Sequence, residues 1–326
     1  MSTETMRIEA PAKLNLCLFL GPRRGDGLHE LCSLFEPLAL ADSLTVSAAG
    51  EPAAGGGMAG RDEVVCAGVE GENLAARALA ALRREGWDGP PLRIEIEKRI
   101  PVAAGLGGGS ADAAAVLRLA REAESAGLSR RRPGVRASGA AAIPDLAGIA
   151  AELGADVPSQ LDPALALVRG AGERVERLPT PAPHAVVLLP GGGGLSTAAV
   201  FAEADRLGLG RGEEELERLA AGLREAAGGG ASPLAYADLL ANDLEPAARS
   251  LRPDIGDALD ALRGAGAPLA FMSGSGPTAV GLFPDLTSAR EAAARLKPPP
   301  PPHGDAEDTF DAIVCEAGRA NLEPGR

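Results

Sequence analysis

A glycine-rich loop that leads into a helix carries the clearest chemical signal in the sequence. Residues 101–117 read PVAAGLGGGSADAAAVL, so four glycines occupy five positions just before an alanine-rich helical segment. Glycines let backbone amides approach an anion closely, and a helix N-terminus adds unpaired N–H groups and the positive end of a dipole. We therefore predict that this loop binds phosphate, with Ser110 as the helix N-cap and as a phosphate contact.

Two standard phosphate-binding motifs do not match this loop. A P-loop requires a Gly-Lys pair, and the chain has none. The dinucleotide fingerprint requires a third glycine where Ser110 stands. A tight turn that only needs positive φ would explain one or two glycines, whereas four favour anion binding.

Lys13, Asn15 and Asp156 are further candidates for chemistry. Lys13 and Asn15 lie two positions apart on an extended segment, so their side chains project to one face. Lysine is rare in this arginine-rich chain, and an ammonium is not equivalent to a guanidinium beside a reacting oxygen. Taken alone, Lys13 also fits a solvated strand face, and Asp156, just before Val157-Pro158, also fits a helix N-cap. The residues by themselves leave both alternatives open.

The elements around these residues indicate an α+β fold. The proline-rich stretch 179–183 predicts a boundary between two domains, residues 1–180 and 181–326. In the first we expect strands at 6–20, 43–48 and 92–97, helices at 73–85 and 146–153 and after the glycine loop, and a hairpin over 164–178. In the second we expect strands at 185–189, 268–272, 278–283 and 309–315, and helices at 213–226, 254–265 and 288–296. Residues 130–142 and 298–302 read as surface loops.

Composition excludes several classes of function. The net charge of -13 and the low aromatic content (Phe 6, Tyr 1, Trp 1) disfavour nucleic acid and membrane surfaces as partners. No segment resembles a signal peptide or a membrane span, so we expect a cytoplasmic protein. The isolated cysteines and histidines predict reduced thiols and no metal site built by the protein.

Six segments together resemble the GHMP kinase superfamily, and within it most closely the family of diphosphocytidyl-methylerythritol kinases. The loop alone indicates only the superfamily, whereas the Lys-x-Asn, Asp-Gly-x-His and Leu-Gly-Ala-Asp-Val-Pro pieces are specific to the family. In chain order the segments are APAKLNL at 10–16, RGDGLHEL at 24–31, the loop at 101–114, LGADVP at 153–158, NDLE at 242–245 and SGSGPT at 273–278.

The resemblance implies a two-domain GHMP kinase fold of the α+β class. The N-terminal domain would be ribosomal protein S5 domain 2-like and bind ATP, and the C-terminal domain would be ferredoxin-like and bind the substrate. The implied activity is ATP-dependent phosphorylation of the 2-hydroxyl of a cytidine diphosphate-linked polyol in the non-mevalonate isoprenoid pathway. Mg²⁺ would accompany ATP, and the protein would be a monomer or a weak homodimer.

The resemblance also implies roles for individual residues. Asp156 would be the general base, and Lys13 would lie between its carboxylate and the γ-phosphoryl group. The implied ATP site comprises Asn73, Lys98, Pro101, Ala104, Gly105, Leu106, Gly107, Gly108, Gly109, Ser110 and Ala111. The implied substrate site comprises Asn15, Leu28, His29, Phe35, Phe201, Gly274 and Ser275. No residue is assigned as a metal ligand.

Leu28 departs from the family pattern, because the family usually has a tyrosine there that stacks on cytosine. Phe201, and Phe35 nearby, are the aromatics left for that task. A homoserine-type or mevalonate-type GHMP kinase is the alternative enzyme, against which His29 argues. A non-catalytic ligand sensor of the same fold is the alternative class, against which the presence of both Lys13 and Asp156 argues.

Overall fold

The computed structural model describes residues 5–49, 61–69, 71–125, 145–296 and 312–318. Among these residues no helix is long and apolar enough to cross a membrane. The four cysteines are free thiols, as the sequence predicted. The loops expected at 130–142 and 298–302 lie outside the described residues.

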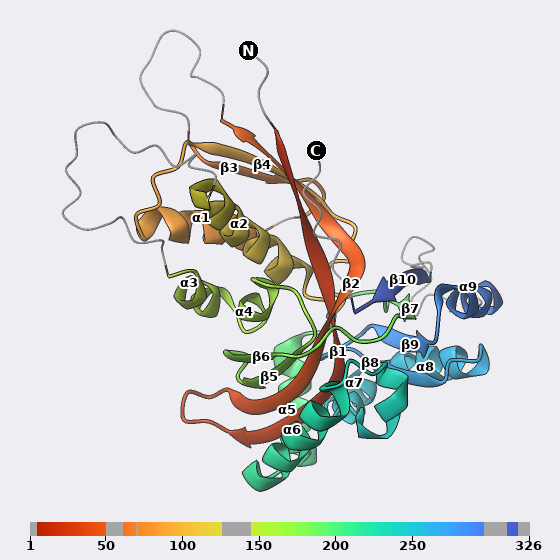
Figure 1. Ribbon diagram of the computed structural model, residues 1–326. Helices are drawn as coiled ribbons and strands as arrows, with labels where there is room; N and C mark the ends of the chain where they lie inside the picture. Colours follow the sequence, from red (N-terminus) through yellow and green to blue (C-terminus); the bar gives the residue numbers. More distant parts are fainter. Residues whose placement is uncertain (1–4, 50–60, 70, 126–144, 297–311, 319–326) are drawn as a thin grey trace, which may run out of the picture.

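A long antiparallel hairpin runs through the molecule (Figure 1). Its strands are β1, Met6–Arg23, and β2, His29–Ala48. The turn between them is closed by Asp26, whose Oδ1 accepts the Leu28 N–H at 3.0 Å, and Gly27 supplies a φ of 87°. The sequence predicted only part of this hairpin. The first half of β2 was missed because it is buried almost throughout and lacks the alternation of a half-buried strand.

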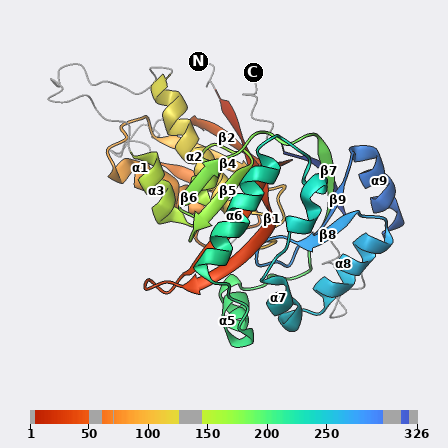
Figure 2. The same cartoon turned by 60° about the horizontal axis from the view of Figure 1, so that its bottom comes forward.

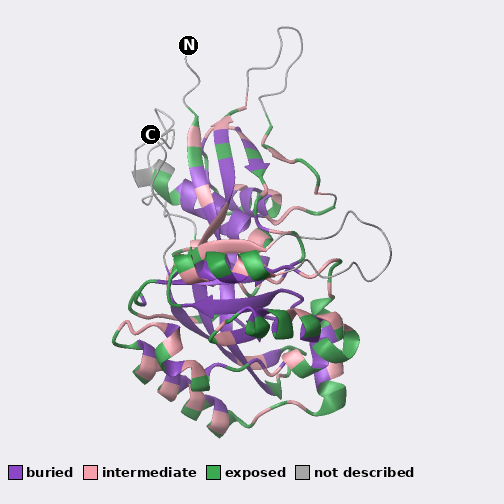
Figure 3. Ribbon diagram, turned by 90° about the vertical axis from the view of Figure 1, so that its right-hand side faces the viewer, coloured by how far each residue is buried: buried purple, intermediate pink, exposed green. Residues whose placement is uncertain are grey.

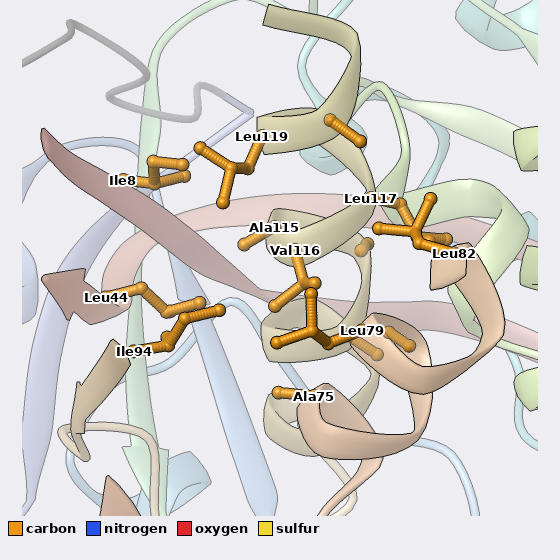
Figure 4. Close-up of a cluster of buried hydrophobic side chains, with 14 of the residues drawn as sticks. Ile8, Leu44, Ala75, Leu79, Leu82, Ile94, Ala115, Val116, Leu117 and Leu119 are labelled. Atoms are coloured by element: carbon orange, nitrogen blue, oxygen red, sulfur yellow. The ribbon is translucent and has the colours of Figure 1, made fainter. Parts of the chain in front are cut away.

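In the N-terminal half, two further strands extend the sheet of this hairpin, and helices pack against it. Strands β4, Leu92–Glu97, and β3, Glu63–Cys66, extend the sheet beyond β2. The helices are α1, Leu74–Arg84; α2, Gly108–Ser125; α3, Leu146–Leu153; and α4, Val157–Gln160. Figure 4 shows Ile8, Leu44 and Ile94 of the strands facing Leu79 and Val116 of α1 and α2. The predicted helices at 73–85 and 146–153 are confirmed, the first with Asn73 as its N-cap.

Two more strands extend the sheet from the first half of β2. They are β5, Ala166–Gly170, which pairs with residues 31–35, and β6, Arg174–Arg177, and they confirm the predicted hairpin. Helix α6, Glu213–Ala227, packs on the long hairpin through Leu216 and Leu223 (Figure 2).

The C-terminal half has its own helices and strands. Its strands are β7, His184–Leu189; β8, Leu269–Met272; β9, Ala279–Phe283; and β10, Ile313–Ala317. Its other helices are α5, Thr197–Leu207; the 3₁₀ helix η1, Pro233–Leu239; α7, Glu245–Leu251; α8, Asp254–Gly264; and α9, Leu286–Arg295. Figure 3 shows buried strands in the middle of the molecule and helices whose outer faces are exposed. The prediction missed α5, η1 and α7. Helix α5 buries only Val200 and Ala204, so its apolar pattern is weak.

Strand β10 joins the two halves of the sheet, because it pairs with β7 and with Leu38 of β2. A buried pair crosses the same junction, where His184 Nε2 lies 3.1 Å from Glu36 Oε2. His184 Nδ1 donates to the Ala182 carbonyl oxygen at 2.9 Å. Burial lowers the pKa of His184, but its hydrogen bond and charge interaction with Glu36 outweigh that effect and raise the pKa above its usual value.

A buried cluster of charged residues anchors the glycine loop between β4 and α2. Asp42 Oδ1 accepts the backbone N–H groups of Arg99 and Ile100 at 2.6 and 2.8 Å. Lys98 Nζ contacts the Asp42 carboxylate and donates to Asp112 Oδ2 at 2.8 Å. Burial raises the pKa of the Asp112 carboxyl to about 7 against the opposing effect of Lys98, and Asp42 adds to the rise.

The pKa of Asp112 predicts how stability changes with pH. Because the pKa is raised in the folded state, that state binds more protons than the unfolded chain between about pH 4 and about pH 7, and stability falls as pH rises through this window. An amide in place of this carboxyl would not titrate. We therefore expect the unfolding free energy of the wild type to fall, relative to that of Asp112→Asn, by about 2 kcal/mol between about pH 5 and about pH 8. Urea unfolding at both pH values measures this difference, and an equal value at both would contradict it.

Candidate active site

Two cavities meet at the glycine loop. The first, of about 790 Å³, lies between the β1–β2 hairpin, helix α5 and the turn at 273–277. The second, of about 490 Å³, lies around the loop at 101–110 and the start of α1. Gly105, Gly107 and Thr197 line both cavities, so a molecule in one can reach a molecule in the other.

The glycine loop has a conformation that other residues cannot adopt easily. Gly105 and Gly107 have φ values of 75° and 70°. A Cβ on Gly105 would lie 2.7 Å from the Gly276 carbonyl oxygen, so the loop touches the turn of the C-terminal half directly. Thr278 Oγ1 donates to the Ala104 carbonyl oxygen at 2.6 Å and fixes the same contact.

Helix α2 starts earlier than the sequence predicted. The Gly107 carbonyl oxygen accepts the Ala111 N–H at 2.9 Å, so Gly107 is the N-cap and the prediction of Ser110 as N-cap was wrong. The glycines at 108 and 109 enter the helix themselves. The amides of residues 107–110 consequently have no acceptor within the helix, and these residues line the second cavity. This is the arrangement that binds a phosphate anion.

Lys13 and Asp156 form an ion pair where the two cavities meet. Lys13 Nζ lies 3.2 Å from Asp156 Oδ2, and the Lys13 side chain is only 7% exposed. Asp156 precedes α4, but its side chain makes no capping hydrogen bond. The alternatives of a solvated lysine and a helix cap therefore do not describe these two residues.

The neighbours of Lys13 hold its chain in place. The Lys13 backbone N–H donates to the Leu106 carbonyl oxygen at 3.0 Å, which ties β1 to the loop. A Cβ on Gly107 would lie 3.0 Å from Lys13 Cε, so the lysine passes directly beside the loop. The Phe35 ring centroid lies 4.8 Å from Nζ, within the range of a cation–π interaction.

Asn242 and Thr197 position the turn at 273–277. Asn242 Nδ2 donates to the carbonyl oxygens of Met272 and Gly274, at 2.7 and 2.8 Å. The hydroxyl groups of Thr197 and Ser275 are 2.9 Å apart. These contacts place Gly274 and Ser275 on the wall of the first cavity.

An aromatic pair also lines the first cavity. The rings of His29 and Phe201 have centroids 5.5 Å apart, and His29 Nε2 lies 2.8 Å from Asp205 Oδ1. Leu28 lies beside them and is 55% exposed. The two rings contact each other, so a flat, partly polar group would pack against these side chains rather than between the rings.

Most residues that the sequence singled out lie in the two cavities. The first cavity is lined by both predicted catalytic residues and all predicted substrate residues: Lys13, Asn15, Leu28, His29, Phe35, Asp156, Phe201, Gly274 and Ser275. The second is lined by Asn73, Lys98, Pro101, Ala104, Gly105, Leu106, Gly107, Gly108, Gly109 and Ser110. Ala111 lines neither, because its side chain is fully buried in the core and its amide bonds to Gly107.

Sequence reasoning missed Ser33, Thr197 and Asp205, which also line the first cavity. Lys98 is in its predicted cavity, but two carboxylates hold its ammonium. No group of three or more His, Cys, Asp or Glu residues within the described ranges could hold a metal ion.

The chain is also similar to known families and structures. The family models "GHMP kinases N terminal domain" and "GHMP kinases C terminal" match residues 73–161 and 214–298. The 4-diphosphocytidyl-2-C-methyl-D-erythritol kinase of Thermobifida fusca is 41% identical over 90% of this chain and 92% of its own length. The crystal structure of a 4-(cytidine 5'-diphospho)-2C-methyl-D-erythritol kinase superposes with a TM-score of 0.69 and 32% identity, over 97% of this chain and 100% of that one.

A more distant structure separates fold from activity. The homoserine kinase of Cytophaga hutchinsonii superposes with a TM-score of 0.57 over 100% of this chain and 98% of that one, at 19% identity, and so shares the fold alone. The two-domain GHMP kinase fold of the α+β class is thereby confirmed. With this fold, and with close relatives that match along most of its length, the chain belongs to the family of 4-diphosphocytidyl-2-C-methyl-D-erythritol kinases.

Proposed function

We propose that this chain transfers the γ-phosphoryl group of ATP to the 2-hydroxyl of 4-diphosphocytidyl-2-C-methyl-D-erythritol, in the non-mevalonate route to isoprenoids. One observation in the candidate active site supports this proposal most directly. The Lys13–Asp156 pair, with 3.2 Å between Nζ and Oδ2, lines the first cavity at the glycine loop that both cavities share. A donor in the second cavity and an acceptor alcohol in the first would meet there.

Asp156 acts in this proposal as the general base. Its side chain is 31% exposed, so one part faces the cavity while Oδ2 is paired with Lys13. The carboxylate takes the proton of the acceptor hydroxyl as the oxygen attacks the γ-phosphorus, and the bond from the γ-phosphorus to the β–γ bridging oxygen breaks so that ADP leaves. Phosphoryl transfer depends mainly on position and charge, so a base aligned with the hydroxyl is sufficient protein chemistry at that oxygen.

Lys13 acts in this proposal as the fixed cation beside the transferring group. Its ammonium donates to Asn15 Oδ1 at 2.6 Å, and it contacts Asp156 and the Phe35 ring. Three contacts on a nearly buried side chain leave little freedom of movement. A cation that is already in place stabilises the charge of the transition state without the cost of reorganisation.

The second cavity binds the ATP phosphates in this proposal, through the backbone amides at the start of α2. Mg²⁺ in kinase sites binds mainly to phosphate oxygens, and a serine or threonine hydroxyl can be one of its few protein ligands. The second cavity fits this requirement, because Ser110 supplies a hydroxyl at the helix N-terminus. Mg²⁺ would be held there with ATP and would neutralise part of the phosphate charge.

The first cavity binds the cytidine substrate in this proposal. The cytosine lies against Phe201 and Leu28, and His29 offers it a hydrogen bond. The Asp205 carboxylate at 2.8 Å fixes the orientation of the His29 ring. The polyol extends from there toward Lys13 and Asp156, along the wall formed by Gly274 and Ser275.

We also propose that the boundary between the ATP-binding and substrate-binding domains lies near residue 180. The matched family regions end at 161 and begin again at 214, which supports a boundary between them. The first cavity nevertheless takes its lining from both sides of that boundary. We propose a monomer or a weak homodimer, as the family resemblance implies.

The acceptor alcohol is the direct test of the proposed function. We expect ADP release coupled to phosphorylation of 4-diphosphocytidyl-2-C-methyl-D-erythritol, and no more than background release with homoserine or mevalonate. A coupled ATPase assay with the three alcohols side by side, with Mg²⁺ present, measures this. Faster turnover with homoserine or mevalonate would overturn the proposal.

Removing the base should impair the chemical step alone. We expect Asp156→Asn to lower kcat by roughly two to four powers of ten and to leave the Kd of ATP nearly unchanged. Steady-state kinetics and nucleotide titration give the two values. Asp162→Asn is the matched control, because that carboxyl is 73% exposed and lies six residues further along the chain. If Asp156→Asn keeps kcat within a few-fold of the wild type, another group is the base.

The aromatic end of the first cavity should control affinity rather than rate. A base–aromatic stack is worth roughly 1 to 3 kcal/mol. Phe201→Ala should therefore raise the KM of the cytidine substrate by roughly fivefold to a hundredfold, and Leu28→Tyr should lower it, both with little change in kcat because the base binds equally in ground and transition states. An unchanged KM in Phe201→Ala would show that cytosine binds elsewhere.

A further inference from the structure

The side-chain amide of Asn15 is directed toward protein groups rather than toward open space. Its Oδ1 accepts from Lys13 Nζ at 2.6 Å, and its Nδ2 donates to Ser33 Oγ at 2.8 Å. Asn15 is only 3% exposed. We predicted from the sequence that Asn15 is a substrate contact, but its amide is engaged at both ends by other side chains.

The orientation of this amide matters because its two ends have opposite chemistry. An asparagine amide has nearly the same shape when it is flipped, but the flip exchanges an acceptor for two donors. Lys13 has only donors to offer. A flipped Asn15 would therefore turn its NH₂ group toward the ammonium and lose the 2.6 Å hydrogen bond. Some neighbour must make the flipped state unfavourable.

Ser33 is that neighbour, because its single hydroxyl proton is already used. Ser33 Oγ donates to the Cys17 carbonyl oxygen at 2.5 Å and is 1% exposed. It can then offer only a lone pair to Asn15, and a lone pair requires the NH₂ end of the amide. With Nδ2 held by Ser33, Oδ1 is left facing Lys13.

An irregularity in the hairpin register explains why the Ser33 hydroxyl donates to the Cys17 carbonyl oxygen. Asn15 pairs with Phe35 and Cys17 with Leu34, so β1 has one extra residue between them. Serine hydroxyls satisfy backbone groups on both sides of it. Ser273 Oγ accepts the Asn15 N–H at 3.1 Å, and Ser33 Oγ donates to the Cys17 carbonyl oxygen.

We propose that Ser33 is a positioning residue for phosphoryl transfer: its hydroxyl fixes the Asn15 amide with Oδ1 toward Lys13, and so holds Nζ beside Asp156. Ser33 acts only through Asn15 and does not need to touch the reacting atoms. This inference rests on the role of Lys13 in the proposed function.

A matched pair of variants tests the hydroxyl. Ser33→Thr keeps the hydroxyl. Ser33→Val has nearly the shape of the threonine variant but has no hydroxyl. We expect kcat to fall roughly tenfold to hundredfold in Ser33→Val and to stay within about threefold of the wild type in Ser33→Thr, with the KM of both substrates nearly unchanged, because a misplaced catalytic group loses rate at this scale. If Ser33→Val does not fold, Ser33→Ala replaces it with the same expectation.

The dependence on Asn15 separates positioning from a structural role. In an Asn15→Ala background, Ser33→Val should cause no further loss of kcat, because the group it orients is absent. Ser43→Ala is the control for a buried serine on the same strand whose hydroxyl has no partner within the described residues, and it should keep full turnover.

The outcomes distinguish this inference from the proposed function. Turnover is measured with whichever alcohol the acceptor assay accepts, and Lys13→Ala is measured in parallel. If Lys13→Ala is inactive, two outcomes would overturn the role of Ser33 and leave that of Lys13. One is an equal kcat in Ser33→Thr and Ser33→Val. The other is a full further loss of kcat when Ser33→Val is added to the Asn15→Ala background. If Lys13→Ala keeps wild-type turnover, both roles are overturned.

Discussion

The register of the β1–β2 hairpin decides where the chemistry can take place. Lys13, Leu14 and Asn15 pair regularly with residues 35–37, and the register shifts on both sides of this short segment. Within it, alternation turns Lys13 and Asn15 to the cavity and Leu14 to the core, where it is fully buried. A slip of one residue would turn the lysine toward the apolar core and the leucine toward the cavity. The apolar packing of the hairpin therefore fixes the ammonium as firmly as its polar contacts do.

A second constraint on the site is the close approach of the two halves of the molecule at the glycine loop. The missing Cβ of Gly105 lets the loop touch the Gly276 carbonyl oxygen, and Thr278 bonds to the Ala104 carbonyl oxygen. On the other side, the cluster of Asp42, Lys98 and Asp112 ties the loop to β2 and α2. The loop is held from both directions, so its amides are in place before any anion arrives.

Local patterns in the sequence predicted the parts of the site that local structure determines. The two-residue spacing of Lys13 and Asn15 predicted a shared face, and the glycine run predicted the helix-terminus site; both residues line one cavity and the loop lines the other. Ser33 and Asp205 could not be found this way. Ser33 matters through a register shift between strands, and Asp205 through its contact with a histidine 176 residues away. Helix α5 was missed although Ser196 and Gly208 cap it, because only Val200 and Ala204 are buried and they form too short an apolar stripe to recognise.

Charge explains why backbone amides, rather than a basic patch, would bind the phosphates in the proposed function. The chain has a net charge of -13, and the cations among the described residues that line the two cavities are Lys13, Arg23 and Lys98. Lys98 is already paired with two carboxylates, so it adds no net positive charge to the second cavity. Amides that point from a helix N-terminus attract an anion without adding a formal charge. In the proposed function Lys13 is the cation beside the reacting groups, and it is the residue whose position the hairpin, the loop and the Asn15 amide all constrain.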